Sequence, residues 1–385
     1  WAYYLLSQIC VVLLFLLIFK FSKEFFKNSY LAFLSVVVLE GIYFYNFTTP
    51  EFNVNIAQLP FWSLTIYFSW RCIKKEKLLD YIFLGLFAGL GILSKYLFIY
   101  LALGISLLFV YLIKKRKKIF LKNYLAAILT TCLVLLPHII WLINNQFPSI
   151  EYGFSRTGGV GNFFEHFSLP LIFLAKQILL LIPFLFLIFL IVKRVKIKKK
   201  FNDSKTIFLF FSVLIPILLI FITSMIFGIK IRTMWMTPFY LFLGVLSIHL
   251  FQINLNYFSI KKFIFVFLFF FFLSPILYGY ISITETTKRT DFYGKQISEL
   301  VKRKWDKNFS NQISIVVGDE WYAGNLSYHL ESRPKWFSKL SEKQLNKIDN
   351  KGVIYVGNPK ILKKICPGTF GSIKPVGYCM IGEKW

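Results

Sequence analysis

Charged and polar side chains gather in four short intervals that lie between long apolar runs. The first interval, TTPEFNVNIAQLPFW at 48–62, contains one carboxylate, Glu51, and no basic residue. A carboxylate without a local partner can accept a proton, or bind a metal ion or a cation from another segment. Asn53 and its neighbours can hydrogen-bond hydroxyl groups without adding charge. The interval therefore has the residue types of a polar binding site that includes a proton acceptor.

The other three intervals, LSKY with Lys95, 144–167 and 228–236, add cations, two further carboxylates and aromatic residues. Arg suits phosphate groups through its bidentate fork, and Lys binds them as a point charge. His138 and Trp141 are three residues apart and share one face of a predicted helix. The candidate binding residues are Asn53, Lys95, His138, Trp141, Glu151, Arg156, Lys230 and Arg232.

Each candidate also has an ordinary interpretation. Glu51 can be a solvated loop acid, and Lys95 can extend to lipid headgroups. His138 can be a hydrogen-bonded core histidine, while Lys230 and Arg232 can be interface anchors. The residue types alone do not separate these alternatives.

The apolar runs that must position these residues indicate a polytopic membrane protein. Of the 385 residues, 57% are apolar and 46 are Phe, which leaves too little polar surface for a soluble chain. Ten segments come close to the length needed for a hydrocarbon core of about 30 Å. They lie near 2–19, 30–47, 57–72, 81–94, 96–113, 123–143, 169–192, 206–227, 235–253 and 263–283.

The net charge of +27 follows the pattern of a membrane protein and does not indicate a nucleic-acid partner. Basic residues cluster in alternate loops, at 20–27, 71–77, 114–118, 193–200 and 261–262. Cytoplasmic loops carry this excess, so the partners of these charges are membrane lipids. The four polar intervals then lie together on the outer face of a bacterial inner membrane, and Trp1 lies outside. If Trp1 lies outside, an odd number of membrane spans must precede it in the full protein. We therefore expect the sequence to be N-terminally truncated.

Residues 285–385 differ from the membrane domain expected over 1–284. ISIVVG at 313–318 and GVIYVG at 352–357 are typical of buried strands, and DFYGKQISELVKRKW and EWYAGNLSYHLE of helices. The alternation predicts a small extracytoplasmic α/β domain. Cys366 and Cys379 are its two cysteines. An external compartment permits a disulfide between them, and free thiols are the alternative.

Three stretches resemble the polytopic GT-C glycosyltransferases of the bacterial family 39 type, which include protein O-mannosyltransferase-like and lipid A aminoarabinose transferase-like enzymes. These stretches are TTPEFNVNIAQLPFWSLTIYFSW, the glycine-rich DYIFLGLFAGLGILSKY and LLPHIIWLINNQFPSIEY. The resemblance covers roughly 1–240. It implies an all-α GT-C-like helical bundle, to which such proteins often add a soluble C-terminal domain.

The resemblance also implies an activity, the inverting transfer of one sugar. The donor would be a polyprenyl-phosphate sugar, and the acceptor a lipid, glycan or protein on the outer face. Family members carry their main catalytic acid in the first outer loop, which would precede Trp1. Glu51 would then assist catalysis from the second outer loop. The cofactor is unknown, and a divalent metal ion is left open.

Two other classes remain as alternatives. A polytopic transporter or lipid flippase would carry no transferase chemistry, and it often shows internal repeats and polar residues near mid-membrane. We see no clear repeat, and the polar residues lie at the outer ends of the spans. A scaffold protein that uses its tail to bind partners is the third interpretation.

Overall fold

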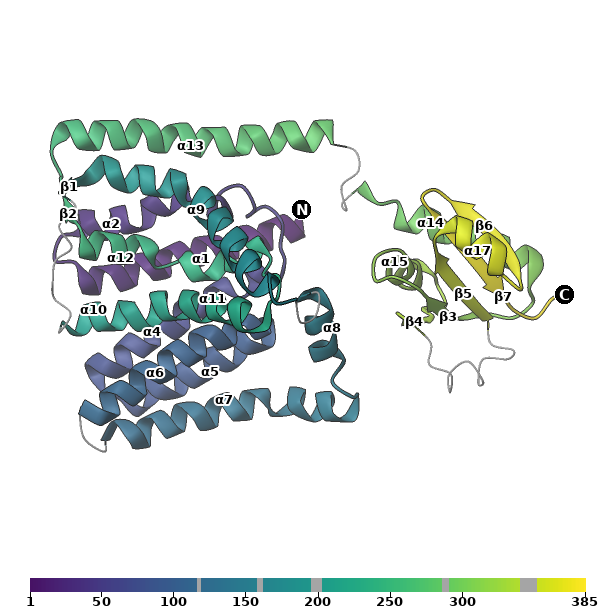
Figure 1. Ribbon diagram of the computed structural model, residues 1–385, viewed down its shortest axis with the longest axis horizontal. Helices are drawn as coiled ribbons and strands as arrows, with labels where there is room; N and C mark the ends of the chain where they lie inside the picture. The colour runs from purple at the N-terminus through teal and green to yellow at the C-terminus, as the bar shows by residue number, and fades with distance from the viewer. Residues whose placement is uncertain (116–118, 158–161, 195–202, 286–290, 340–351) are drawn as a thin grey trace. The chain divides into compact units, whose positions relative to one another are not determined.

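The computed structural model describes residues 1–115, 119–157, 162–194, 203–285, 291–339 and 352–385. The chain forms two compact units (Figure 1). We call Trp1–Tyr280 the membrane unit and Ile281–Trp385 the C-terminal unit. Each unit is described by itself.

The membrane unit is a bundle of helices. Its elements are α1 (Ala2–Phe25), α2 (Ser29–Val37), η1 (Val38–Gly41), η2 (Tyr43–Tyr45), α3 (Val54–Ala57), α4 (Leu59–Lys75), α5 (Leu78–Ser94), η3 (Tyr96–Phe98), α6 (Ile99–Lys115), α7 (Ile119–Asn144), α8 (Pro148–Thr157), α9 (Glu165–Ile191), α10 (Ser204–Leu209), η4 (Phe210–Leu214), α11 (Ile215–Phe227), η5 (Thr233–Tyr240), α12 (Leu243–Leu250) and α13 (Tyr257–Thr284). Two short antiparallel strands, β1 (Val192–Arg194) and β2 (Gln252–Ile253), pair at one end.

Among the described residues, six helical segments are long and apolar enough to cross a membrane. A seventh span results if η5 and α12, which meet at a bend of 55°, are counted as one. Helices such as Leu78–Ser94 are apolar but shorter. The polytopic membrane class predicted from the sequence is therefore confirmed, whereas the number of about ten crossings stays a prediction.

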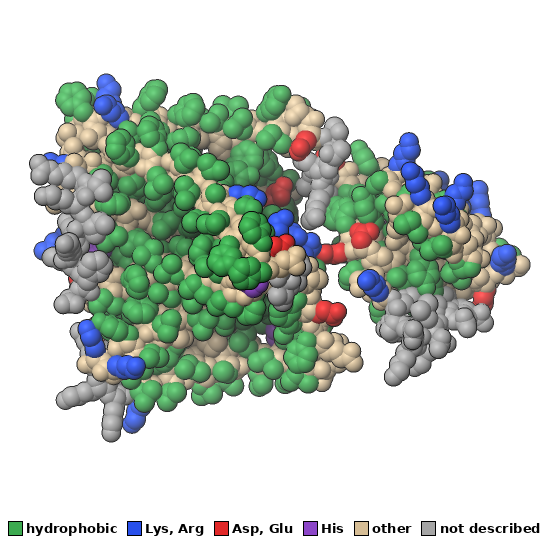
Figure 2. All heavy atoms as spheres, viewed as in Figure 1, with side chains coloured by type: hydrophobic (Ala, Val, Ile, Leu, Met, Phe, Trp, Pro, Cys, Tyr) green, Lys and Arg blue, Asp and Glu red, His purple; other side chains and the backbone are tan. Residues whose placement is uncertain are grey.

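Hydrophobic side chains cover most of the face of the bundle that Figure 2 shows. The most apolar window of α13 has no buried residue, and only 11% of the corresponding window of α7 is buried. Water would penalise so much exposed apolar surface, whereas lipid tails would not. These outer helices thus have the surface expected of lipid-facing segments.

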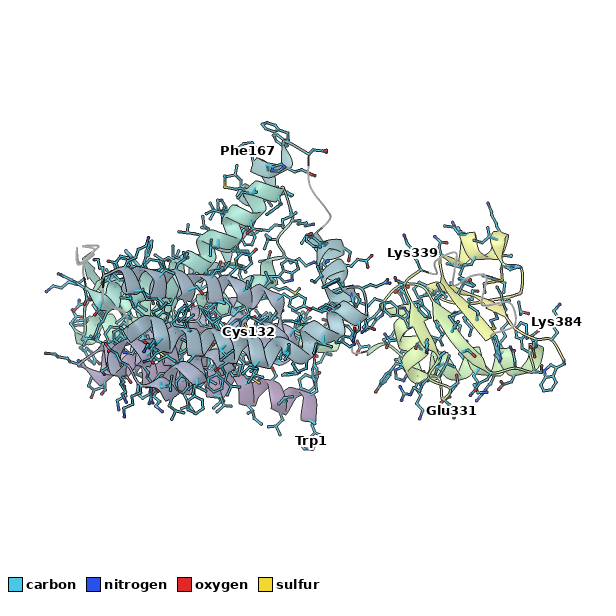
Figure 3. The ribbon with its side chains drawn as sticks, turned by 90° about the horizontal axis from the view of Figure 1, so that it is seen from below. Trp1, Cys132, Phe167, Glu331, Lys339 and Lys384 are labelled. Atoms are coloured by element: carbon cyan, nitrogen blue, oxygen red, sulfur yellow. A yellow bond between two sulfur atoms is a disulfide. The ribbon has the colours of Figure 1, made fainter. Side chains whose placement is uncertain are left out.

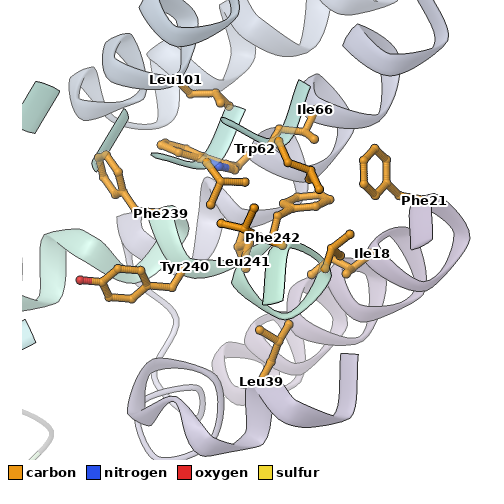
Figure 4. Packing of buried hydrophobic residues seen from close by; sticks show 14 of the residues in the cluster. Ile18, Phe21, Leu39, Trp62, Ile66, Leu101, Phe239, Tyr240, Leu241 and Phe242 are labelled. Carbon is orange, nitrogen blue, oxygen red and sulfur yellow. The ribbon is translucent and has the colours of Figure 1, made fainter. Parts of the chain in front are cut away.

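An aromatic core joins the helices that support the polar intervals (Figure 4). The ring of Trp62 in α4 lies 4.9 Å from that of Phe239 in η5, and Phe21 in α1 lies 5.0 Å from Phe242. All four side chains are almost completely buried. Because α3 immediately precedes α4, this packing places α3 against η5.

The glycine-rich stretch of the sequence serves helix packing. A Cβ on Gly85 would lie 2.2 Å from the carbonyl oxygen of Ala127, and one on Gly89 would lie 2.8 Å from Val134. Only glycine allows α5 and α7 to approach so closely. This contact fixes the position of Lys95, which directly follows α5.

The start of α9 diverges from the other helices of the membrane unit. Figure 3 shows the turn that carries Phe167 standing away from the bundle. The helix contains Pro170 and Pro183, each of which removes a backbone donor and favours a bend. Leu180, which lies between these two prolines, lines the cavity described below.

The C-terminal unit is a small α/β fold around a five-stranded sheet. Its elements are α14 (Gly294–Asn308), β3 (Ile313–Val317), α15 (Tyr322–His329), β4 (Lys335–Phe337), β5 (Gly352–Gly357), α17 (Pro359–Ile365), β6 (Thr369–Ile373) and β7 (Val376–Ile381). The strand order is β4-β3-β5-β7-β6. β3 is parallel to β4 and β5, whereas β7 is antiparallel to β5 and β6.

The two predicted strands and two predicted helices of this unit are confirmed, and β4, β6 and β7 were missed. The core of the unit contains Trp305, Val316 and Ile354, each at most 1% exposed. Cys366 and Cys379 are joined by a disulfide, which confirms the first of the two alternatives. The bond ties the end of α17 to β7.

Candidate functional site

A cavity of about 530 Å³ lies in the membrane unit where η2, α3, α9, η5 and α13 meet. Its lining combines polar side chains with aromatic rings. The lining residues are Tyr43, Phe44, Phe47, Thr48, Glu51, Asn53, Asn55, Ile56, Leu180, Thr233, Met234, Thr237 and Tyr278. Glu51 and Asn53, two of the residues predicted from the sequence, are thus brought to one cavity.

The loop that carries Glu51 is anchored on both sides. The Thr49 carbonyl oxygen accepts hydrogen bonds from Ser7 Oγ and, at 3.1 Å, from Gln8 Nε2, both in α1. After Glu51, the side chain of Asn53 caps α3, because its Oδ1 accepts from the Asn55 amide at 2.8 Å. Glu51 itself is exposed. Its carboxylate is therefore held at the mouth of the cavity by a fixed backbone.

Lys95 contacts the protein instead of extending to the surface. Its ammonium group donates a hydrogen bond to Oδ1 of Asn55 and lies 5.4 Å from the ring centroid of Trp235. Burial lowers the pKa of Lys95 to about 7. The Lys95 ammonium, held next to a cavity residue in this way, is suited to bind an anionic ligand. A bound anion would in turn favour the protonated form of Lys95.

The segment at 228–236 runs beside the same cavity. Lys230 and Arg232 are both exposed, and Arg232 directly precedes Thr233, which lines the cavity. The backbone amide of Lys230 donates to the Thr157 carbonyl at the end of α8, at 3.3 Å. Arg232 is thus adjacent in sequence to a residue that lines the cavity, whereas the backbone of Lys230 is bonded to the end of α8.

His138 and Trp141 form a separate aromatic pair on α7. Their rings are stacked, with centroids 5.7 Å apart and planes at 13°. His138 Nε2 lies 2.7 Å from the hydroxyl of Tyr96, the residue that follows Lys95. The shared helix face is confirmed, but neither residue lines the cavity. A binding role for the pair stays a prediction.

The two candidates on α8 are not brought to the cavity by any contact among the described residues. Glu151 is exposed. Nε of Arg156 donates a hydrogen bond to the Tyr152 hydroxyl at 2.8 Å. The Arg156 guanidinium also lies 4.9 Å from the ring centroid of Tyr152. Figure 2 shows that acidic and basic side chains gather at the end of the membrane unit where α8 lies.

Several residues at the site were not predicted. Trp235 contacts Lys95, and Tyr43, Phe47 and Tyr278 form much of the aromatic wall. The Tyr43 and Phe47 rings are stacked at 5.3 Å, and Phe47 meets Tyr278 at 5.9 Å. Aromatic residues are so frequent in these spans that their type alone cannot distinguish a binding residue from a packing residue.

Within the described ranges, no group of three or more His, Cys, Asp or Glu side chains is arranged to hold a metal ion. Glu51 is the one carboxylate that lines the cavity in this part of the chain.

Comparisons with known proteins agree with the resemblance derived from the sequence. Residues 1–141 match the family model described as dolichyl-phosphate-mannose-protein mannosyltransferase. No curated protein gives a significant match.

The fold is similar to that of two solved structures of ArnT from Cupriavidus metallidurans. The structure in the apo state gives a TM-score of 0.58, and the one bound to undecaprenyl phosphate gives 0.53. In both cases the identity is 12%, and the match covers 97% of this chain and 83% of the other. The GT-C-like helical bundle with a small C-terminal α/β unit is thereby confirmed.

Proposed function

We propose that this protein is a membrane glycosyltransferase that moves a sugar from a polyprenyl-phosphate donor to an acceptor, with inversion at the anomeric carbon. The observation that carries the proposal is the cavity that places the Glu51 carboxylate and the side chains of Asn53 and Asn55, the latter bonded to Lys95, around one space. The matching family model and the ArnT bound to undecaprenyl phosphate support the donor class.

The chemistry requires a proton acceptor on one side of the sugar. An acceptor hydroxyl or amine must lose a proton as it attacks the anomeric carbon, and a positioned carboxylate contributes typically about 10²–10⁴-fold to such a step. We propose that Glu51 assists this step, because it is the carboxylate at the cavity among the described residues. Asn53 would hold sugar hydroxyls.

The other side of the reaction requires positive charge. When the anomeric bond to the donor breaks, the lipid phosphate keeps the electron pair and becomes more negative. Lys95 is bonded to the lining residue Asn55, and Arg232 directly precedes the lining residue Thr233. Such cations stabilise developing phosphate charge. We propose that these two residues bind the phosphate, with His138, Trp141, Glu151, Arg156 and Lys230 forming the surrounding outer surface.

The aromatic part of the cavity suits both halves of the donor. Aromatic rings stack on the apolar faces of ligands, and Tyr hydroxyls add polar contacts. Leu180 and Phe47 both line the cavity, and the face of the unit seen in Figure 2 is largely apolar. An isoprenoid chain could therefore lie along the bundle while its phosphate and sugar occupy the cavity. We place this cavity and the C-terminal unit on the outer face of the inner membrane.

The test is a turnover assay on protein expressed from the complete coding sequence and reconstituted in nanodiscs. A panel of radiolabelled polyprenyl-phosphate sugars is offered with lipid, glycan and peptide acceptors. We expect one donor to release polyprenyl phosphate and label one acceptor class. Movement of intact donor across a liposome bilayer, with no labelled product, would contradict the proposal and indicate a flippase.

A further inference from the structure

The C-terminal unit has a second cavity, distinct from that of the membrane unit. It measures about 530 Å³ and lies at the carboxyl ends of β3 and β5. Two of its lining residues, Asp319 and Tyr322, follow β3, and two others, Asn358 and Lys360, follow β5. The rest of the lining consists of Gly357, Pro359, Pro375 and Val376. The volume falls in the range of about 300–1,000 Å³ that small-molecule sites occupy.

The position of this cavity follows from the topology of the sheet. β3 and β5 are adjacent and parallel, but their connections leave in opposite directions (Figure 1). From β3 the chain passes through α15 to β4, whereas from β5 it passes through α17 to β6 at the other end of the sheet. The crevice outside two such strands is the place where open α/β sheets bind ligands.

The backbone at this crevice is shaped for close approach. Gly318, directly after β3, has a φ of 149°, and a Cβ there would lie 2.4 Å from the Val356 carbonyl oxygen. Tyr378 of β7 is buried and interacts with Asp319 and Tyr322, which line the crevice. Burial, together with these two residues, raises the pKa of Tyr378 to about 12. The phenol of Tyr378 is therefore neutral and adds no charge near the crevice.

The ends of both helices at the crevice are already capped, which argues against an anionic ligand. Oδ1 of Asp319 accepts hydrogen bonds from the amides of Trp321 and Tyr322, both at 2.8 Å. Oδ1 of Asn358 accepts from the Lys360 amide at 2.9 Å. The free amides that would hold a phosphate are thus occupied, and the Asp319 carboxylate would repel it.

The remaining groups form a balanced set of donors and acceptors. Oδ2 of Asp319 can accept, the amide nitrogen of Asn358 and the ammonium of Lys360 can donate, and the Tyr322 hydroxyl can do both. The rings of Phe292 and Tyr322 lie 5.9 Å apart, which holds the phenol in place. A neutral molecule with several hydroxyl groups matches this set best, because each hydroxyl both donates and accepts.

We propose that this crevice is a binding site for a neutral carbohydrate of one or two sugar units. The site needs no catalytic step, and its existence does not depend on the transferase function proposed above.

The test is ligand-observed NMR on the complete protein in nanodiscs. The probes are glucose, mannose, galactose, N-acetylglucosamine and maltose. Inorganic phosphate is the anionic ligand used for comparison. We expect at least one sugar to bind with a dissociation constant in the millimolar range or below. Asp319→Asn keeps the helix cap but loses the charge, and Lys360→Met loses the ammonium; each should weaken binding about tenfold.

Matched controls are available in the same unit. Glu331→Gln and Lys384→Met change the same kinds of group at exposed positions away from the crevice (Figure 3). Both should bind sugar as the wild type does, and all four variants should melt at the same temperature. The proposal is overturned if no sugar of the panel binds, if only phosphate binds, or if the Asp319 and Lys360 variants bind sugar normally.

Discussion

The ammonium group of Lys95 and the side-chain oxygen of Asn55, forty residues apart in the chain, are hydrogen-bonded beside the cavity of the membrane unit. Asn55 also lines that cavity, together with Glu51. The contact links the end of α5 to α3 and brings a cation and a carboxylate to the same part of the molecule.

Replacement of Lys95 tests the role of this cation. Lys95→Gln keeps a polar group that can still bond Asn55, but it removes the charge. Since a hydrogen bond to a charged group contributes about 1.5–3 kcal/mol, kcat/KM for the lipid-phosphate donor should fall roughly 10- to 100-fold. Steady-state kinetics in nanodiscs measures this. Lys122→Gln on α7 is the matched control and should be unchanged; wild-type kinetics in both variants would make Lys95 a structural residue.

Arg232 provides a second test of phosphate binding. Arg232→Ala removes an exposed guanidinium just before the cavity residue Thr233. The variant should raise KM for the donor about tenfold or more while the protein melts normally, because the residue is not part of the core. Arg303→Ala in the C-terminal unit is the control. Equal KM values for the two variants would reduce Arg232 to an interface anchor.

The topology can be tested with reporter fusions. Fusions after Phe163 and at Trp385 should be external, and fusions after Lys118 and Lys200, which lie outside the described residues, should be cytoplasmic. The reason is the alternation of basic and weakly charged loops. Fusions to alkaline phosphatase and to green fluorescent protein at each position measure on which side of the membrane that position lies. A cytoplasmic signal at Trp385 is incompatible with a C-terminal unit on the outer face.

The disulfide should stabilise the C-terminal unit. Cys366 and Cys379 are 13 residues apart, and closing a loop of about this size contributes roughly 3 kcal/mol in the chain-entropy model. Cys366→Ser should therefore lower the unfolding midpoint of this unit, and reduction of the wild type should do the same. Cys132→Ser in α7 is the control, because that cysteine is free. An unchanged midpoint after reduction would show that the bond contributes little.

Much of the fold could be predicted from composition and pattern, because long apolar runs and alternating basic loops have direct physical causes. The strands β3 and β5 were found because they are short runs rich in Ile and Val. β4 is only three residues long, and β6 and β7 each contain glycine, so neither length nor pattern distinguished them.

The candidate site was predicted in part. Glu51 stood out because it is a carboxylate in an interval without a basic residue, and Asn53 because it lies in the same polar interval between two apolar runs. The pairing of Lys95 with Asn55 and Trp235 joins residues that are far apart in the chain, so it is a tertiary feature that no local pattern predicts. Phe47 and Tyr278 could not be recognised as cavity residues, because aromatic residues are frequent throughout the apolar spans and most of them serve packing.

The most direct test of the transferase proposal is Glu51→Gln, assayed for sugar transfer in protein expressed from the complete coding sequence. Gln keeps the size of the side chain but cannot accept the proton or pair strongly with a cation. We predict that kcat falls by about 10²-fold or more while KM for the donor changes little, since the change acts on the transition state. Glu299→Gln on α14 is the control and should keep full activity. Full transfer activity in the Glu51 variant would contradict the account and leave Glu51 as a solvated loop acid.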